Sequence, residues 1–100
     1  MNHAQLKAFH AVAETGGFSA AAKTLGLTQP AVTLQIQALE QAYDTKLFQR
    51  RGRKTEITAS GKLLLEIARK MLRLEEEAHR LLSSIGTLDS GRLNVVASSS

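Results

Sequence analysis

The sequence predicts a mainly α-helical chain in which a small domain of three helices and one short β-hairpin precedes a long helix. Apolar residues recur three and four positions apart over much of the 100 residues, which indicates amphipathic helices. Hydrophobic residues make up 43% of the chain but aromatic residues only 4%, so the expected core consists of Leu, Ala, Ile and Val. Two short apolar runs around a cluster of arginines predict the hairpin.

The first helix is expected over residues 2–14. Asn2 can cap it, and Gln5 stands at the position that completes a capping box. Its apolar face carries Leu6, Phe9, Val12 and Ala13. A Gly-Gly pair then ends the helix, and we expect the following Phe18 to be a core residue.

Residues 19–42 predict two short helices joined by a tight turn. We expect Ser19 to cap the first helix and Gly26 to end it in the left-handed conformation. Thr28 can cap the second helix, with Pro30 in its first turn. The residues that tie the two helices together are Ala22, Gly26 and Val32. This spacing is typical of a helix-turn-helix, whose second helix lies in the major groove of DNA, although any αα-hairpin of a small bundle is the alternative.

The second of these helices is expected over residues 29–43, with one buried and one exposed face. The buried stripe comprises Val32, Ile36, Leu39 and Tyr43, with Gln35 at its margin. The exposed face comprises Gln29, Pro30, Thr33, Leu34, Gln37 and Gln41, and it has no acidic residue before Glu40. A glutamine or a hydroxyl can pair with base edges, and an apolar side chain can meet a thymine methyl group. We therefore expect base contacts from Gln29, Pro30, Thr33 and Leu34. Contacts to the DNA backbone are expected from Ser19, Thr28, Gln35 and Gln37.

A basic hairpin follows, with strands expected over residues 47–50 and 56–58 and a tip over residues 51–54. A basic hairpin after a recognition helix is typical of a wing, whereas a solvated charged loop is the alternative. We expect Arg50, Arg51 and Lys54 to contact phosphates and Arg53 to enter the minor groove.

Thr58 should cap a long helix over residues 59–85. An unbroken heptad seam runs along it, made of Leu64, Ile67, Met71, Leu74, Ala78, Leu81 and Ile85. This seam predicts a dimer interface, with a packed monomeric helix as the alternative. The first half is also expected to pack on the helix-turn-helix, through Leu63, Leu65, Ala68 and Leu72.

The residue pattern of the sequence changes after Gly86, where the heptad repeat stops. Residues 87–91 predict a linker, and an alternating pattern from Arg92 predicts the first strand of a further domain. We therefore divide the chain into a winged helix-turn-helix (residues 1–58), a dimerisation helix (residues 59–86), and a hinge with the start of a truncated C-terminal effector-binding domain (residues 87–100).

Together these residues resemble the N-terminal DNA-binding domain of LysR-type bacterial transcriptional regulators. The resemblance covers about residues 6–85. It is carried by Leu6, Phe9, residues 18–22, Leu25, residues 28–33, Gln35, Ile36, Leu39, Glu40, residues 47–50, Ile57, Thr58 and Gly61. The sequence departs from the family at Gly17, often a serine, at Thr33, commonly a serine, and at Asp44 and Thr45, where a glycine and a small apolar residue usually close the helix.

The resemblance implies a cytoplasmic, sequence-specific regulator that binds an interrupted inverted-repeat promoter site in double-stranded DNA. It implies a homodimer, a tetramer for the full-length protein, and RNA polymerase as a further candidate partner. A small-molecule inducer is implied for the missing C-terminal domain, and no cofactor is expected in this part of the chain.

Composition limits the other function classes. The net charge of +4 suits a polyanion, and the absence of cysteine excludes a disulfide framework and a thiolate metal site. We expect no enzyme, because no catalytic triad, phosphate-binding glycine loop or metal cluster is present, and no apolar run is long enough to span a membrane. The rival classes are a helical interaction module with a basic loop and an RNA-binding module, although the latter would want an aromatic platform.

Overall fold

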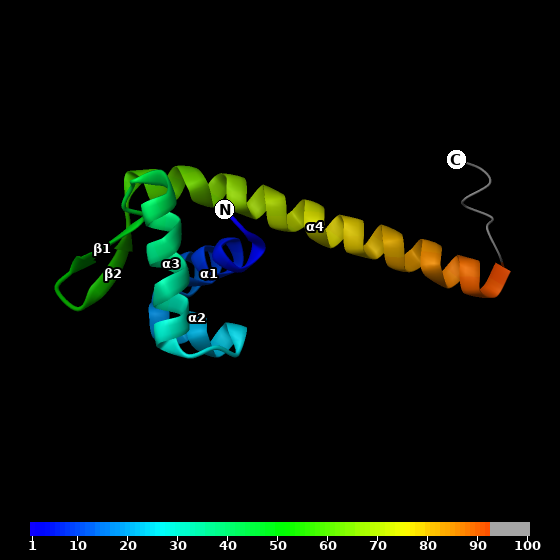
Figure 1. The fold of residues 1–100 in the computed structure, drawn as a ribbon, viewed down its shortest axis with the longest axis horizontal. Coiled ribbons are helices and arrows are strands. Elements are labelled where there is room, and N and C mark those ends of the chain that lie inside the picture. The colour runs from blue at the N-terminus through cyan, green and yellow to red at the C-terminus, as the bar shows by residue number, and fades with distance from the viewer. Residues whose placement is uncertain (93–100) are drawn as a thin grey trace. The chain divides into compact units, whose positions relative to one another are not determined.

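The computed structural model describes residues 1–92, with side chains described as far as residue 86. Its elements are α1 (His3–Thr15), α2 (Phe18–Leu25), α3 (Gln29–Tyr43), β1 (Phe48–Arg51), β2 (Lys54–Ile57) and α4 (Ala59–Arg92) (Figure 1). The predicted mainly α winged helix-turn-helix with a long C-terminal helix is confirmed. The chain divides into two compact units, Met1–Arg69 and a second that begins at Lys70. No helix of the described part is long and apolar enough to cross a membrane.

Helix α1 begins with the predicted capping box. The Gln5 N–H donates to Asn2 Oδ1 at 2.8 Å, and the Asn2 N–H donates to Gln5 Oε1 at 3.0 Å. Gly16 ends the helix in the left-handed region, with φ of 85°. The capping box and the glycine that ends the helix were therefore predicted correctly, and each predicted end of the helix was one residue too early.

The start of α2 differs from the prediction. Gly17, in extended backbone, is the N-cap, and its carbonyl accepts the first helical hydrogen bond from the Ala21 N–H at 3.1 Å. Ser19 lies inside the helix, so its predicted role as the cap was wrong. The helix begins early because Phe18, its first residue, packs edge-on against Phe48, with ring centroids 5.9 Å apart. The end of α2 is as predicted, at Gly26 with φ of 68°.

Helix α3 has the predicted bounds, cap and inner face. Thr28 Oγ1 accepts from the Ala31 N–H at 3.2 Å, and Pro30 occupies the first turn. The buried residues are Val32, Ile36 and Leu39. Tyr43 was wrongly placed in this stripe, because it is 57% exposed. It stands at the last residue of the helix, where its phenol oxygen accepts from the Met1 amino group at 3.4 Å and can stay hydrated.

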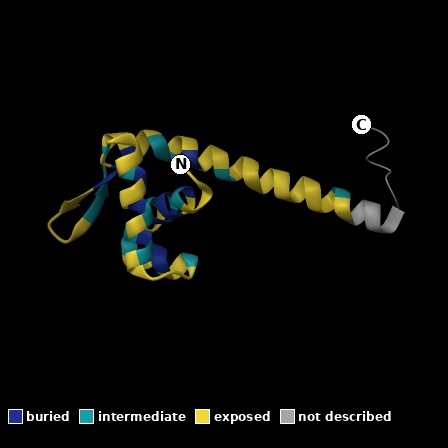
Figure 2. Cartoon of the chain, viewed as in Figure 1, coloured by how far each residue is buried: buried dark blue, intermediate teal, exposed yellow. Residues whose placement is uncertain are grey.

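The core lies among the first three helices (Figure 2). The largest fully buried side chains are Phe9, Val12, Val32, Ile36 and Leu39. Ala21 and Ala22 are also buried, and such small side chains allow the helices to approach closely. This core fixes α3 by one face and leaves its other face outside.

The hairpin is tighter than predicted. Its antiparallel register pairs Phe48 with Ile57 and Arg51 with Lys54, so only residues 52–53 form the turn. The predicted strands were thus too short at the tip, and Leu47 and Thr58 lie outside them. Gly52 provides the left-handed residue that the turn needs, with φ of 64°. The Phe48 ring anchors the hairpin in the core, 5.4 Å from the Phe9 ring.

Helix α4 begins as predicted, with Thr58 Oγ1 accepting from the Gly61 N–H at 3.0 Å. Ala68 is buried as expected, but Leu63 is exposed, so its predicted packing on the helix-turn-helix was wrong. The helix continues to Arg92, so the predicted end at residue 85 and the linker over residues 87–91 were also wrong. A single glycine costs a helix only about 1 kcal/mol, and no proline follows Gly86. The strand expected from Arg92 lies, apart from Arg92 itself, outside the described residues.

Candidate nucleic-acid interface

The outer face of α3 carries the side chains predicted to read bases. Gln29 and Pro30 are exposed, Thr33 is half-buried, and Leu34 is 65% exposed. Gln37, one turn further on, is also exposed, whereas Gln35 is half-buried. Because the opposite face is locked in the core, these side chains project from a rigid element, as base reading requires.

Ser19 and Gln29 form a direct link between the two helices of the helix-turn-helix. The Ser19 hydroxyl donates to Gln29 Oε1 at 3.1 Å. Both residues are exposed, so the bond lies on the outer surface. Sequence reasoning placed Ser19 near the DNA backbone but missed this contact, because the two residues are ten positions apart.

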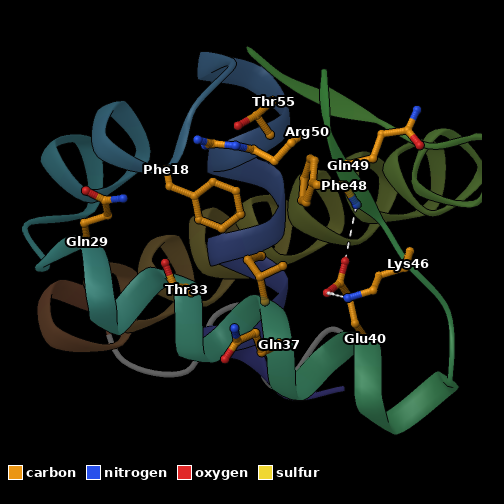
Figure 3. A pocket seen from close by; sticks show the side chains of 11 residues that line it. Phe18, Gln29, Thr33, Gln37, Glu40, Lys46, Phe48, Gln49, Arg50 and Thr55 are labelled. Atoms are coloured by element: carbon orange, nitrogen blue, oxygen red, sulfur yellow. Dashed lines mark hydrogen bonds and ion pairs between the residues drawn. The ribbon is translucent and has the colours of Figure 1, made fainter. Parts of the chain in front are cut away.

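A groove runs between α3 and the hairpin (Figure 3). Gln29, Thr33 and Gln37 line it from the helix, and Arg50 lines it from the hairpin. The Phe18 and Phe48 rings lie between these two walls in Figure 3. The groove therefore brings predicted base-reading residues and a predicted phosphate-binding arginine to the same hollow.

The basic residues of the hairpin are all exposed: Arg50, Arg51, Arg53 and Lys54. Arg51 differs from the others, because its Nη1 lies 3.6 Å from Glu56 Oε2 on the opposite strand. Arg50, Arg53 and Lys54 line a second hollow, which they share with Ser19 and Gln29. The hairpin cations and the start of the helix-turn-helix thus form one positively charged surface.

The amino end of α2 also borders this second hollow. Gly16, Gly17 and Phe18 line it, and no side chain caps the helix. The first amide groups of a helix carry a partial positive charge and bind anions. The absence of a capping side chain leaves these amides available to a phosphate, an arrangement the predicted Ser19 cap would have prevented.

Glu40 is the residue of this surface that sequence reasoning missed. Its Oε2 accepts from the Leu47 N–H at 2.8 Å and from the Phe48 N–H at 3.3 Å, and its Oε1 lies 3.8 Å from Lys46 Nζ. The side chain is only 11% exposed. Glu40 therefore joins the end of α3 to the start of the hairpin. The only signal for this role was an isolated acid on an otherwise uncharged helix face.

The predicted dimer seam lies on the outside of the chain in both units. In the first unit, Ile67 is exposed and Leu64 is half-buried. In the second unit, Leu74 is 63% exposed, and Met71, Ala78 and Leu81 are exposed as well, while Ile85 is half-buried. An apolar stripe of this kind on a helix is available to a partner.

Three packed helices, a turn at Gly26 and a basic hairpin define the class of protein as a winged helix-turn-helix. The family follows from comparison with known proteins. Residues 3–62 match the family model of the bacterial regulatory helix-turn-helix proteins of the lysR family, and the chain belongs to this family of DNA-binding transcriptional regulators.

Relatives and solved structures agree with this assignment. An HTH-type transcriptional regulator from the ibpB–leuC intergenic region of Azotobacter vinelandii is 46% identical over 98% of this chain and 68% of its own length. The HTH-type transcriptional regulator TfdT of Cupriavidus pinatubonensis is 46% identical over 92% of this chain and 40% of its own. The DNA-binding domain of CbnR, crystallised with DNA, is 42% identical and superposes with a TM-score of 0.77 over 86% of this chain and 99% of that one. The chain therefore spans less than half of TfdT and about two thirds of the Azotobacter protein.

Proposed function

We propose that this chain reads a specific promoter site in double-stranded DNA by placing α3 in the major groove and the β1–β2 wing in an adjacent minor groove. The observation that carries the proposal is the single surface formed by the outer face of α3 and the cations of the wing. A face with neutral polar side chains beside a cluster of arginines suits a groove floored by bases and bordered by phosphates. The DNA-binding domain of CbnR has the same fold and was crystallised with DNA, which supports DNA as the partner of this surface.

The base contacts in this proposal come from the first two turns of α3. Gln29 and Thr33 lie one turn apart, and each has a polar group that can pair with base edges. Pro30 and the exposed Leu34 offer apolar surface to thymine methyl groups.

The phosphate contacts come from the border of the same surface. Arg50 and Lys54 line the hollows beside α2 and α3, and Gln37 lines the one beside α3. Thr28 and Gln35 lie outside both hollows and are proposed as further phosphate contacts on the helix-turn-helix. Arg53, next to Gly52 in the turn, is proposed to enter the minor groove. Arg51 adds less to the positive potential of the surface than its neighbours do, because the Glu56 carboxylate faces its guanidinium group.

The assembly is proposed to be a homodimer formed through the heptad seam of α4, and a tetramer in the full-length protein. A dimer would present two copies of α3, so we propose an interrupted inverted repeat as its target. The proposed division is a winged helix-turn-helix (residues 1–58), a dimerisation helix that begins at residue 59, and an effector-binding domain that can begin only after this helix, which runs to Arg92. That last domain would bind the small-molecule inducer, RNA polymerase is a further proposed partner, and the cytoplasm is the proposed location.

Binding-site selection from a randomised duplex library, followed by titration of the selected site, tests this proposal. Gln29→Ala should lower affinity for the selected site by about 1–3 kcal/mol and relax base choice, while Gln41→Ala, exposed on the same helix, should not. Arg53→Ala should weaken binding to all sequences and reduce the salt dependence. Selection that returns no common sequence would refute specific recognition and favour a basic interaction module.

A further inference from the structure

We propose that Ser19 determines base specificity by acting through Gln29. Its hydroxyl holds the Gln29 carboxamide by the oxygen and leaves the amide N–H groups to meet the DNA. Ser19 is thus a positioning residue rather than a phosphate contact. This inference rests on the proposed role of Gln29 in base reading.

The geometry defines which end of the carboxamide is held. Ser19 Oγ donates to Gln29 Oε1 at 3.1 Å, and both side chains border the hollow that Arg50, Arg53 and Lys54 line. In Figure 3 the Gln29 amide nitrogen lies on the side toward Phe18, and the carboxamide oxygen lies on the opposite side. Because α2 and α3 are both anchored in the core, the bond joins two fixed backbones and orients a flexible side chain.

The orientation changes which bases Gln29 can favour. A free glutamine reads adenine with both ends, since its oxygen accepts from the N6 amino group while its nitrogen donates to N7. A glutamine held by its oxygen has one lone pair already occupied, and it presents mainly donors. Donors suit N7 and O6 of guanine and O4 of thymine, and they discriminate most strongly against cytosine, which offers only a donor.

The inference predicts a specific change in base choice. In binding-site selection, Ser19→Ala should raise the preference for adenine at the base position that Gln29 governs. The expected change is about 2- to 10-fold, the size of a single neutral hydrogen bond. Affinity for non-specific DNA and the slope of affinity against salt should stay at the wild-type values. Ser19→Thr retains the hydroxyl, so this variant should keep the wild-type base preference.

The control is a serine at the same place in another helix. Ser60 is the second residue of α4, as Ser19 is of α2, and both are exposed, so Ser60→Ala makes the same chemical change away from Gln29. The effect of Ser19→Ala should vanish in the Gln29→Ala background, because a double-mutant cycle isolates the coupling between the two side chains.

Four results would overturn the inference. An equal loss of affinity on all sequences with a smaller salt slope would make Ser19 a phosphate contact. A change in preference that persists in the Gln29→Ala background would show that Ser19 does not act through Gln29. An unchanged preference in Ser19→Ala, with an altered one in Gln29→Ala, would refute the coupling and leave the proposed function standing. If Gln29→Ala itself leaves base choice unchanged, the proposed role of Gln29 fails, and the inference fails with it.

Discussion

Removing the Glu40 carboxylate should loosen the hairpin from the recognition helix. Its Oε2 accepts from two consecutive backbone N–H groups, those of Leu47 and Phe48, at 2.8 and 3.3 Å. Both of these residues are buried, so the amides would lose a partner in a place that water reaches poorly. Glu40→Ala therefore acts on the folded state, at the junction of α3 and β1.

The magnitude follows from these two bonds. A hydrogen bond to a charged group contributes about 1.5–3 kcal/mol, and the longer of the two should contribute less than the shorter. The Lys46 contact at 3.8 Å adds little, since that ammonium group is exposed. We expect Glu40→Ala to lower the free energy of unfolding by about 2–4 kcal/mol. Glu40→Gln retains one acceptor oxygen without the charge and should cost about 1–2 kcal/mol.

Urea unfolding monitored by circular dichroism measures these differences. Gln41→Ala is the matched control, because it changes an exposed side chain on the same helix and should stay within about 0.5 kcal/mol of the wild type. DNA affinity of Glu40→Ala, measured below its unfolding transition, should also fall as the wing loses its fixed position. If Glu40→Ala were as stable as Gln41→Ala, the carboxylate would not hold the hairpin.

Three further predictions concern single positions of the fold. Gly61→Ala places a Cβ closer than 3.0 Å to Ile57 and to the Leu47 carbonyl oxygen, so it should destabilise the domain by about 1–3 kcal/mol. Gly86→Ala, which has open space around it, should not destabilise the domain. Equal melting temperatures for the two variants would contradict the close contact at Gly61. Asp44→Gly should stabilise the domain by about 0.5–1 kcal/mol in urea unfolding. Asp44 has a φ of 49°, which glycine adopts more easily, and its carboxylate places a negative charge at the carboxyl end of α3. A loss of stability would instead show that the carboxylate stabilises the fold. Leu74→Glu should yield monomers in sedimentation equilibrium while Arg73→Glu, off the seam, should not, and a dimer that survives Leu74→Glu would place the interface elsewhere.

The elements that could be predicted from the sequence are those fixed by local signals. The capping box of Asn2 and Gln5, the Thr28 cap and the glycine at residue 26 each act within a few residues of themselves. The apolar spacing of α3 placed its outer face correctly, so the exposure of Gln29, Pro30 and Leu34 was predictable as well.

The features that the sequence did not predict depend on contacts between distant residues. Ser19 was expected to cap α2, but Phe18 packs on Phe48, thirty residues away, so the helix begins at Phe18 and Gly17 is its cap. The bonds from Glu40 to the hairpin and from Ser19 to Gln29 cross between separate elements. Tyr43 continued the apolar stripe by spacing, but the stripe extends beyond the core that could cover it.

The surface proposed to meet DNA also depends on where the one acidic group of α3 lies. Glu40 is the only acid on α3, and a free carboxylate there would repel a phosphate backbone. Two backbone amides and Lys46 surround it instead, and its side chain is largely buried. The same carboxylate that fixes the wing beside α3 is thereby withdrawn from the surface. The bonds of the Glu40 carboxylate thus do two things that binding in a DNA groove requires. They fix the distance between α3 and the wing, and they leave the helix face without an exposed negative charge.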